Sequence, residues 1–334
     1  MNQAAGGLLT RVFLRALVVP PLLALTLGAQ AVLAQGYPAK PVRMIIGLPP
    51  GGLVDTLARG TAHELTKVLG QPVIVENRPG ATDAIAATAV AKSAPDGYTI
   101  YLSTSTNMFT AQFLRRNLPY DPVKDFVPVV GLTQTQQILT VNNSIPAGNV
   151  HEFVALARAK PGQLKYGSFG IASAGHLDAE AFAKASGTTY THVPYKGVAA
   201  LMRALVAGEV DFAWTGLTNA VPLVKQGRLK AMVYTGKKRW AALPQVPTVG
   251  EAGYEFETGG MLIIFVPAGT PTEVIDRIAA ATNQVRATPA FRDKFIVGNG
   301  MDELPFHGAA LAARLQQSRE SFAARVKLLD IKLE

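Results

Sequence analysis

The stretch Val42-Arg-Met-Ile-Ile-Gly-Leu-Pro-Pro-Gly-Gly-Leu-Val-Asp-Thr-Leu57 decides the fold of this chain. Its largely apolar start, 42–46, predicts a buried strand, and apolar residues then recur at helical spacing from 57 to 69. Between them, after Gly47 and Leu48, lies Pro49-Pro50-Gly51-Gly52, a loop with few side-chain atoms. A helix N-terminus there presents unpaired backbone N–H groups and a partial positive charge. The stretch predicts a backbone anion site, with a tight strand-to-helix turn as the alternative.

Alternating strand and helix patterns continue along the chain, which predicts an α/β protein with parallel or mixed sheets covered by helices. The chain has 334 residues and exceeds the usual size of one hydrophobic core, so two domains are expected. The sequence Thr270-Pro271-Thr272-Glu273 is typical of a capping box. It predicts a helix with Thr270 as N-cap and Pro271 as its first residue.

Two other predicted strands end in small polar residues. The strand at 98–103 runs into Thr104 and Ser105, and the strand at 165–168 ends at Ser168, with Ser173 just before a predicted helix. Open α/β sheets bind ligands beyond the carboxyl ends of their strands. We therefore expect the loop from Ser168 to Ser173 to face the first loop across a cleft.

The first 34 residues are typical of a secretory signal peptide. Arg11 and Arg15 form a basic start, an apolar segment follows, and small residues precede candidate cleavage points after Ala31 or Ala34. The chain contains no Cys, which excludes a lipid anchor on an N-terminal Cys, a disulfide framework, a Cys nucleophile and Cys-based zinc sites. The mature protein is therefore expected to be free in the periplasm of a Gram-negative cell.

The net charge is +9, and it becomes +7 (9 − 2) when Arg11 and Arg15 leave with the signal peptide. A positive surface gathers anions by long-range attraction. The only dense basic run is Lys237-Lys238-Arg239, without interleaved aromatic residues. Nucleic acid is therefore not an expected partner.

Catalytic and metal-binding signatures are absent from the sequence. No H-E-x-x-H occurs among the five His, and G-x-S-x-G fails around Ser168 because residue 166 is Tyr. No cofactor or metal is therefore expected. His192 is either a structural residue or a cleft-lining group, and Asp211 is either a ligand contact or a strand-end cap. Asp55 falls in the first helical turn, where a carboxylate is favoured, so a structural role that shapes the loop is expected.

The chain resembles the Bordetella uptake gene (Bug) family, the extracytoplasmic solute receptors of tripartite tricarboxylate transporters. The matching segments follow the family's order and cover nearly all of the mature chain. They are Pro49-Pro-Gly-Gly-Leu-Val-Asp55, Glu76-Asn-Arg-Pro-Gly80, Ala94-Pro-Asp-Gly-Tyr-Thr99, Leu118-Pro-Tyr-Asp-Pro-Val-Lys-Asp-Phe126, Tyr166-Gly-Ser168 with Ser173-Ala-Gly-His-Leu177, His192-Val-Pro-Tyr-Lys-Gly197, Val246-Pro-Thr248 with Glu251-Ala-Gly253, and Pro267-Ala-Gly-Thr-Pro271.

The resemblance implies a type II periplasmic binding-protein fold, with two α/β domains and a ligand cleft between them. Residues 37–137 plus 257–334 would form domain 1 and residues 138–256 domain 2. The loops at Pro50–Gly52 and Ser168–Ser173 would grip one ligand carboxylate, with Thr104 and Ser105 lining the cleft. The chain departs from the family at Ala81-Thr82-Asp83, which replaces Ala-Gly-Gly and adds a carboxylate, and at Ala172, which replaces a Gly.

The expected function is that of a non-enzymatic periplasmic receptor, a monomer that binds a small carboxylate such as a dicarboxylate or an aromatic acid. Binding would close the two domains, and membrane transporter subunits would recognise the closed form. One alternative is a periplasmic serine hydrolase that uses Ser168 or Ser173 with His176 or His192. A second alternative is a ligand-binding adaptor for a membrane sensor kinase.

Overall fold

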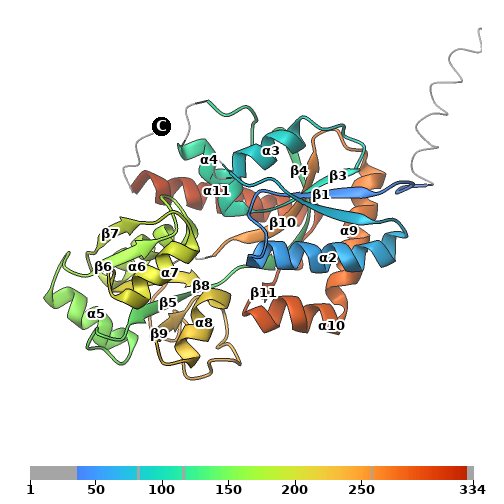
Figure 1. The fold of residues 1–334 in the computed structure, drawn as a ribbon. Coiled ribbons are helices and arrows are strands. Elements are labelled where there is room, and N and C mark those ends of the chain that lie inside the picture. Colours follow the sequence, from blue (N-terminus) through green and yellow to red (C-terminus); the bar gives the residue numbers. More distant parts are fainter. Residues whose placement is uncertain (1–35, 81–82, 115–116, 257–258, 329–334) are drawn as a thin grey trace, which may run out of the picture.

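The computed structural model of the protein describes residues 36–80, 83–114, 117–256 and 259–328, and the expected signal peptide at 1–34 lies outside these ranges. Two β-sheets, each covered by helices, form two lobes that lie side by side (Figure 1). This arrangement confirms the α/β fold expected from the alternating pattern. None of the helices in the described ranges is long and apolar enough to cross a membrane.

The larger sheet has six strands in the order β11-β4-β10-β3-β1-β2. Their bounds are β1 Val42–Ile46, β2 Val73–Asn77, β3 Thr99–Thr104, β4 Phe126–Gln134, β10 Met261–Pro267 and β11 Asp302–Glu303. β1 is parallel to its neighbours β2 and β3, whereas β10 runs antiparallel to β3 and β4. The carboxyl ends of β1 and β3 are therefore neighbours at one edge of the sheet.

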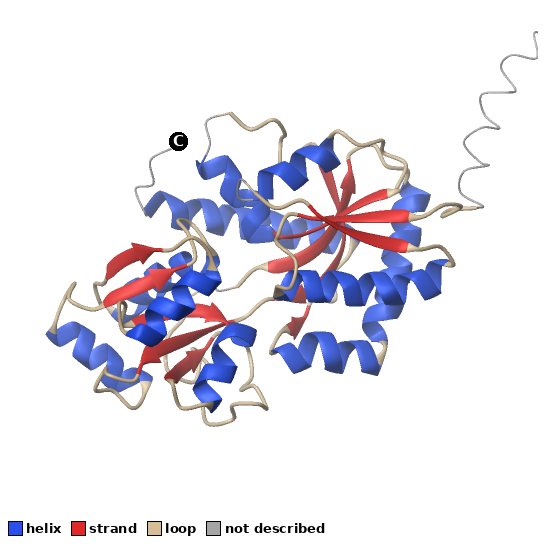
Figure 2. Cartoon of the chain, in the orientation of Figure 1, coloured by secondary structure: helices blue, strands red, loops and turns tan. Residues whose placement is uncertain are grey.

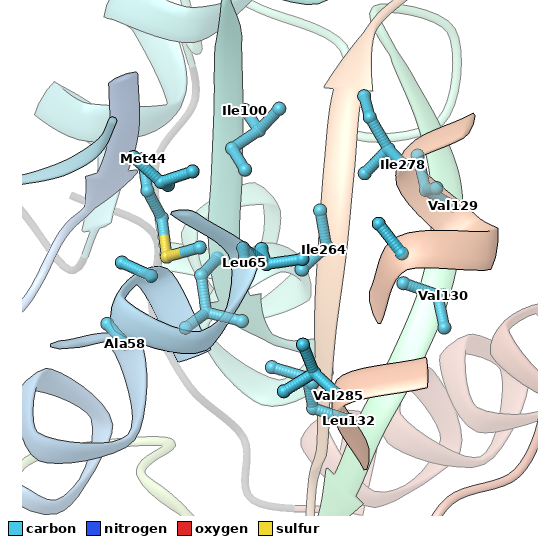
Figure 3. Packing of buried hydrophobic residues seen from close by; sticks show 14 of the residues in the cluster. Met44, Ala58, Leu65, Ile100, Val129, Val130, Leu132, Ile264, Ile278 and Val285 are labelled. Carbon is cyan, nitrogen blue, oxygen red and sulfur yellow. The ribbon is translucent and has the colours of Figure 1, made fainter. Parts of the chain in front are cut away.

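Helices cover both faces of the larger sheet (Figure 2). Side chains of α2 (Leu53–Leu69) and α9 (Thr272–Ala287) pack on one face, and those of α3 (Ala84–Ala91), α4 (Ser105–Leu114) and α11 (Gly308–Leu328) pack on the other. Figure 3 shows the core between the sheet and the helices α2 and α9, where Leu65 of α2 packs among Met44, Ile100 and Ile264 of the strands. Because both faces are buried, these strands are apolar along almost their whole length.

The smaller sheet has five strands in the order β7-β6-β8-β5-β9. Their bounds are β5 Gln137–Asn142, β6 Lys165–Ser168, β7 Thr191–Pro194, β8 Phe212–Gly216 and β9 Leu229–Tyr234. The helices of this lobe are α5 Val150–Ala159, α6 Ala174–Ser186, α7 Val198–Ala207 and α8 Leu217–Lys225. β6 is parallel to both β7 and β8, so the carboxyl ends of these three strands meet at one edge.

Two short segments connect the lobes, and they are hydrogen-bonded to each other. Thr135 follows β4, and Gly260 precedes β10. The Thr135 N–H donates to the Gly260 carbonyl at 2.8 Å, and the Gly260 N–H donates to Thr135 Oγ1 at 2.9 Å. We propose that these paired crossovers form a hinge, with domain boundaries near residues 137 and 257.

The start of α6 is also anchored to the larger lobe. Leu177 of α6 lies in one apolar cluster with Phe322 and Val326 of α11. The neighbouring Asp178 is fully buried, and its Oδ1 lies 3.6 Å from Arg325 Nη1. Burial raises the pKa of Asp178 to about 7, although Arg325 favours the ionised form.

Two helix starts differ from the sequence-based expectation. A helix was not expected after β3, but α4 begins there because Thr104 Oγ1 caps it, accepting the Asn107 N–H at 3.1 Å. The second difference is at α9. The expectation that Thr270 is the N-cap of this helix is wrong, because α9 begins at Thr272 and Pro271 is its N-cap rather than its first residue. The Thr270 hydroxyl instead donates to the Pro267 carbonyl at 2.8 Å and closes the preceding turn.

Between α9 and α11 lie three short helical pieces, α10 Pro289–Phe291, η2 Arg292–Ile296 and η3 Val297–Asn299.

We predict that Asp178→Asn changes the pH dependence of stability. This carboxyl loses its proton near pH 4 in the unfolded chain, but keeps it up to about pH 7 in the folded protein. The folded state therefore loses roughly 1–4 kcal/mol from this group as the pH rises from about 4 to about 7. Urea unfolding from pH 4 to 8 should show wild type losing stability relative to the variant over that interval. Parallel curves for the two proteins would contradict the prediction.

Candidate functional site

The first loop of the site joins β1 to α2 and needs glycine at one position. Gly51 has a φ of +86°, which residues with a Cβ rarely adopt, whereas Gly52 has an extended backbone and is the N-cap of α2 without a side-chain cap. Pro50, Gly51 and Gly52 are exposed, and Leu48 is half-buried. The start of α2 is thus exposed and has no side-chain cap, and anion binding by its backbone N–H groups stays a prediction.

One carboxylate, that of Asp55, holds this loop in place. Its oxygens accept hydrogen bonds from the Gly51 N–H at 3.0 Å, from Asn77 Nδ2 at 2.9 Å and from Arg59 Nε at 3.0 Å. Asn77 also donates to the Leu48 carbonyl at 3.0 Å, so both ends of the loop are tied to one network. Burial alone would raise the pKa of Asp55, but the hydrogen bonds from Arg59, Gly51 and Asn77 outweigh it and lower the pKa. The expected structural role of Asp55 is confirmed.

The junction of β3 and α4 lies beside the first loop because β1 and β3 are adjacent strands. Thr104 is half-exposed and caps α4, so it lies at the sheet edge where a ligand can reach it. Ser105 is buried, and its Oγ accepts the Met261 N–H at 3.0 Å, which ties α4 to β10. A ligand contact by Ser105 therefore stays a prediction, and in this conformation its hydroxyl already has a structural partner.

The second loop joins β6 to α6 in the smaller lobe. Ser173 is the N-cap of α6, and its Oγ accepts the His176 N–H at 3.4 Å. Ser168 is fully buried, with its Oγ 2.7 Å from His192 Nε2 and 3.0 Å from the Gly170 carbonyl. A strand, a loop of mostly small residues and a helix start therefore recur here in the order seen at the first loop.

Ala172 connects the second loop to the larger lobe. It is buried and has a φ of +55°, and its N–H donates to His176 Nδ1 at 3.0 Å. Its carbonyl lies 3.5 Å from Thr110 Oγ1, which belongs to α4. The second loop is thus in contact with the helix that Thr104 caps, and segments of both lobes meet at the candidate site.

Two stacked imidazole rings support the second loop. The His192 ring stacks on the His176 ring with centroids 3.9 Å apart and on the Tyr166 ring with centroids 4.7 Å apart. Burial lowers the pKa of His176 to about 3, with a smaller contribution from His192. Burial also lowers the pKa of His192 to about 4. Both rings are therefore neutral near pH 7, and the structure gives His192 a supporting role beside Ser168.

Asp211 lies outside this site. It directly precedes β8, whereas Ser168 ends the parallel strand β6, so the two residues are at opposite ends of the sheet. Asp211 Oδ2 accepts the Lys165 N–H at 2.7 Å and thereby caps the amino ends of these strands. Of the two roles expected for Asp211, the structure contains the strand-end cap, and the position of Asp211 at the opposite end of the sheet argues against the ligand contact.

Sequence analysis assigned no role to several residues that shape the site. Asn77 and Arg59 complete the network around the first loop, and Thr110 carries the contact between the lobes. Gly216, at the end of β8, is the N-cap of α8 and has no side-chain cap. Its pattern could have been recognised, because a strand followed by Gly and a helix start also describes the first loop.

The arrangement is suited to anion binding. Within the described ranges no group of three or more His, Cys, Asp or Glu residues could hold a metal ion. A cavity of about 790 Å³ lies elsewhere, between α6 and α11, and is lined by Glu180, Lys184, Tyr190 and Arg325 among others. It includes none of the expected site residues, so we place the candidate site at the loops, where helix starts and hydroxyls gather.

Comparisons with known proteins agree with this geometry. The model of a family described as the tripartite tricarboxylate transporter family receptor matches residues 57–323. A UPF0065 protein of Bordetella pertussis (strain Tohama I) is 35% identical over 283 residues, covering 84% of this chain and 86% of that protein. The structure of the periplasmic binding protein BugD has a TM-score of 0.76 at 30% identity, covering 89% of this chain and 100% of that one. The structure of R. palustris Rpa4515 with adipate has a TM-score of 0.78 at 30% identity, covering 87% and 98%.

We predict that His176 and His192 stay neutral throughout the range from about pH 5 to about pH 8, because burial disfavours their charged forms. Nitrogen and carbon chemical shifts of the two imidazoles, recorded by NMR on uniformly labelled protein, should not titrate in that range. Ser168→Ala leaves the ring stack in place and serves as the assignment control for His192. A midpoint above about pH 6 for either ring would contradict the burial that the structure gives them.

Proposed function

We infer the function from one fact: the chain belongs to the family of tripartite tricarboxylate transporter receptors. Its relatives of known structure include a periplasmic binding protein and a protein with bound adipate. The chain is accordingly a solute-binding receptor for carboxylates. We propose further that it works in the periplasm after loss of its signal peptide, as a monomer that delivers its ligand to membrane subunits of the transporter.

The pair of loops at the two helix starts supports the way in which we propose that the ligand is held. The exposed backbone at Gly51 and Gly52 leads into α2, which has no side-chain cap, and the second loop leads into α6 through Ser173. A carboxylate between them would accept N–H groups from one lobe and hydroxyl or N–H groups from the other. Hydrogen bonds to a charged group are stronger than neutral ones, so few donors suffice to orient the ligand.

Domain closure would follow from this division of the site between two lobes. The paired crossovers at Thr135 and Gly260 give a short hinge, and the ligand shifts the balance towards the closed form only as far as it binds that form better. Contacts with both lobes at once supply that difference. The closed form would be the one that the membrane subunits recognise.

The serine hydrolase alternative also has an observation in its favour. Ser168 Oγ and His192 Nε2 are 2.7 Å apart, which is within the range of a nucleophile and its base. However, Ser168 is fully buried, and its hydroxyl is also hydrogen-bonded to the backbone of Gly170. Burial blocks attack on a substrate in the cleft, so we propose that the pair supports the second loop and that the receptor converts none of its ligands.

The proposal is tested by binding and turnover measurements on the same preparation. Mass spectrometry of small molecules released from gently purified protein should detect a carboxylic acid, and adding that acid should raise the melting temperature of the emptied protein. Incubation with carboxylate esters should give no product above the level of Ser168→Ala. Steady product formation that Ser168→Ala abolishes would support the hydrolase, and the absence of any carboxylate that binds would contradict the receptor.

We predict that Gly52→Val weakens carboxylate binding and leaves the fold intact. A Cβ at Gly52 would meet only the Pro49 carbonyl, at 4.0 Å, so the larger side chain fits but covers the exposed backbone. Loss of one charge-assisted hydrogen bond corresponds to roughly 1.5–3 kcal/mol, or about a tenfold to hundredfold weaker affinity. Isothermal titration calorimetry measures the change.

The matched control is Gly250→Val, because Gly250 is exposed, far along the chain in the smaller lobe, and a Cβ there meets nothing within 4 Å. This variant should bind as wild type does. If Gly52→Val folds and keeps the wild-type affinity, then the first loop is only a turn between a strand and a helix.

A further inference from the structure

Asp83 occupies a backbone position that favours glycine. Its φ is +75°, and within the described ranges Ala172 of the second loop is the only other non-glycine residue with a positive φ. A left-handed backbone is unfavourable for a residue with a Cβ, and such strain is typical of functional sites. The strained backbone at Asp83 therefore indicates that its side chain has a functional role.

The Asp83 carboxyl is buried at the start of α3, and only 4% of the residue is exposed. Its Oδ2 accepts a hydrogen bond from Ser103 Oγ at 2.5 Å, and the side chains of Tyr101 and Asn107 also favour its ionised form. Its Oδ1 has no hydrogen-bond partner among the described residues. That oxygen packs so closely over Gly47 that a Cβ there would lie 1.2 Å from it.

These contacts place the carboxyl next to the candidate ligand site. Gly47 directly precedes Leu48 of the first loop, and Ser103 directly precedes Thr104, on the adjacent strands β1 and β3. The half-exposed Asn107 lies in the first turn of α4. Asp83 therefore lies at the carboxyl ends of both strands. On each strand, the residue that it contacts directly precedes an expected ligand contact.

A buried carboxyl at this position would act on the charge of any ligand bound at the two loops. Burial raises the pKa of Asp83, and the hydrogen bond from Ser103 and the nearby side chains of Tyr101 and Asn107, none of which is a cation, offset only part of that effect. A second carboxylate nearby would be repelled, or one of the two groups would have to take up a proton. This repulsion is stronger in partly buried surroundings than in water.

We propose that Asp83 sets the charge class of the ligand: its buried carboxyl, behind the first loop and Thr104, repels a second ligand carboxylate, so the receptor takes monocarboxylates in preference to dicarboxylates. The inference rests on the proposed function, because it concerns the far end of the same ligand. Ile171 in the second loop is 49% exposed and would supply apolar surface for the body of a ligand held by that loop.

The test compares acids that differ by one carboxylate, hexanoate with adipate and 2-hydroxybutyrate with malate. Calorimetry gives the dissociation constants for wild type, Asp83→Asn and Asp83→Gly, after circular dichroism has shown that each protein is folded. Asn keeps the size of the side chain and tolerates a left-handed backbone, and Gly suits that backbone fully. Asp96→Asn is the control, because Asp96 is an exposed carboxylate in the turn before β3, at the other end of that strand from Ser103.

Wild type and Asp96→Asn should bind the monocarboxylate of a pair at least about tenfold more tightly than the dicarboxylate, and both Asp83 variants should reduce that preference about tenfold. An equal preference in wild type and the Asp83 variants would overturn the inference while leaving the proposed function in place. A wild type that prefers the dicarboxylate would also overturn it. Failure of wild type to bind any of the four acids, while a carboxylate released from the purified protein does bind, would overturn the inference and leave the proposed function in place.

Discussion

The hydrogen bonds of the Asp55 carboxylate fix the loop on which the candidate site depends. β1 ends at Ile46 and α2 begins at Leu53, so the chain must reverse its direction within a few residues and still leave backbone N–H groups exposed. Gly51 makes the turn possible, and Asp55 holds it through bonds from Gly51, Asn77 and Arg59. A carboxylate in the first helical turn is also favoured by the helix dipole. A loop held in this way is ordered before the ligand arrives, so less conformational entropy is lost on binding.

The second half of the site is built on different supports. The Ser168–His192 contact and the stacked rings of His176 and Tyr166 hold the second loop in the smaller lobe, with both imidazoles neutral. The larger lobe uses a charged network under the first loop, whereas the smaller lobe uses neutral, buried aromatic groups. Acid therefore destabilises both loops, but through different groups. Protonation of Asp55 breaks the charged network under the first loop, whereas the second loop loses stability because burial keeps its two imidazoles from taking up the protons that they bind in the unfolded chain below about pH 6.5.

Much of the fold could be predicted from the sequence because the patterns are strong. The apolar run of β1 and the helical spacing of apolar residues in α2 predicted both elements and the loop between them. The helix α4 was missed because Ser103, Thr104 and Ser105 form a run of small hydroxyl residues, which is typical of loops as well as of caps. The start of α9 was misplaced for a related reason, since Thr270 bonds backwards to Pro267 rather than forwards into the helix.

The site could be predicted only in part. Loops next to glycine were recognisable. The role of Asp211 was left open between a ligand contact and a strand-end cap, because its position at the start rather than the end of a strand depends on strand bounds that the sequence does not define closely. The roles of His192 and Asp83 depend on contacts between distant segments, such as Tyr166 with His192 and Gly47 with Asp83. Such contacts arise from the packing of whole strands and helices and leave no local pattern in the sequence.

The central claim is that one ligand carboxylate is held by loops of both lobes, so binding must bring the lobes together. The chain has no Cys, and single spin labels can therefore be placed on the exposed residues His63 of α2 and Lys225 of α8 by His63→Cys and Lys225→Cys. Pulsed dipolar spectroscopy of the doubly labelled protein then gives the distance between the lobes with and without a bound carboxylate. The account predicts a shorter and narrower distance distribution at saturation. An unchanged distribution under saturating ligand would contradict it.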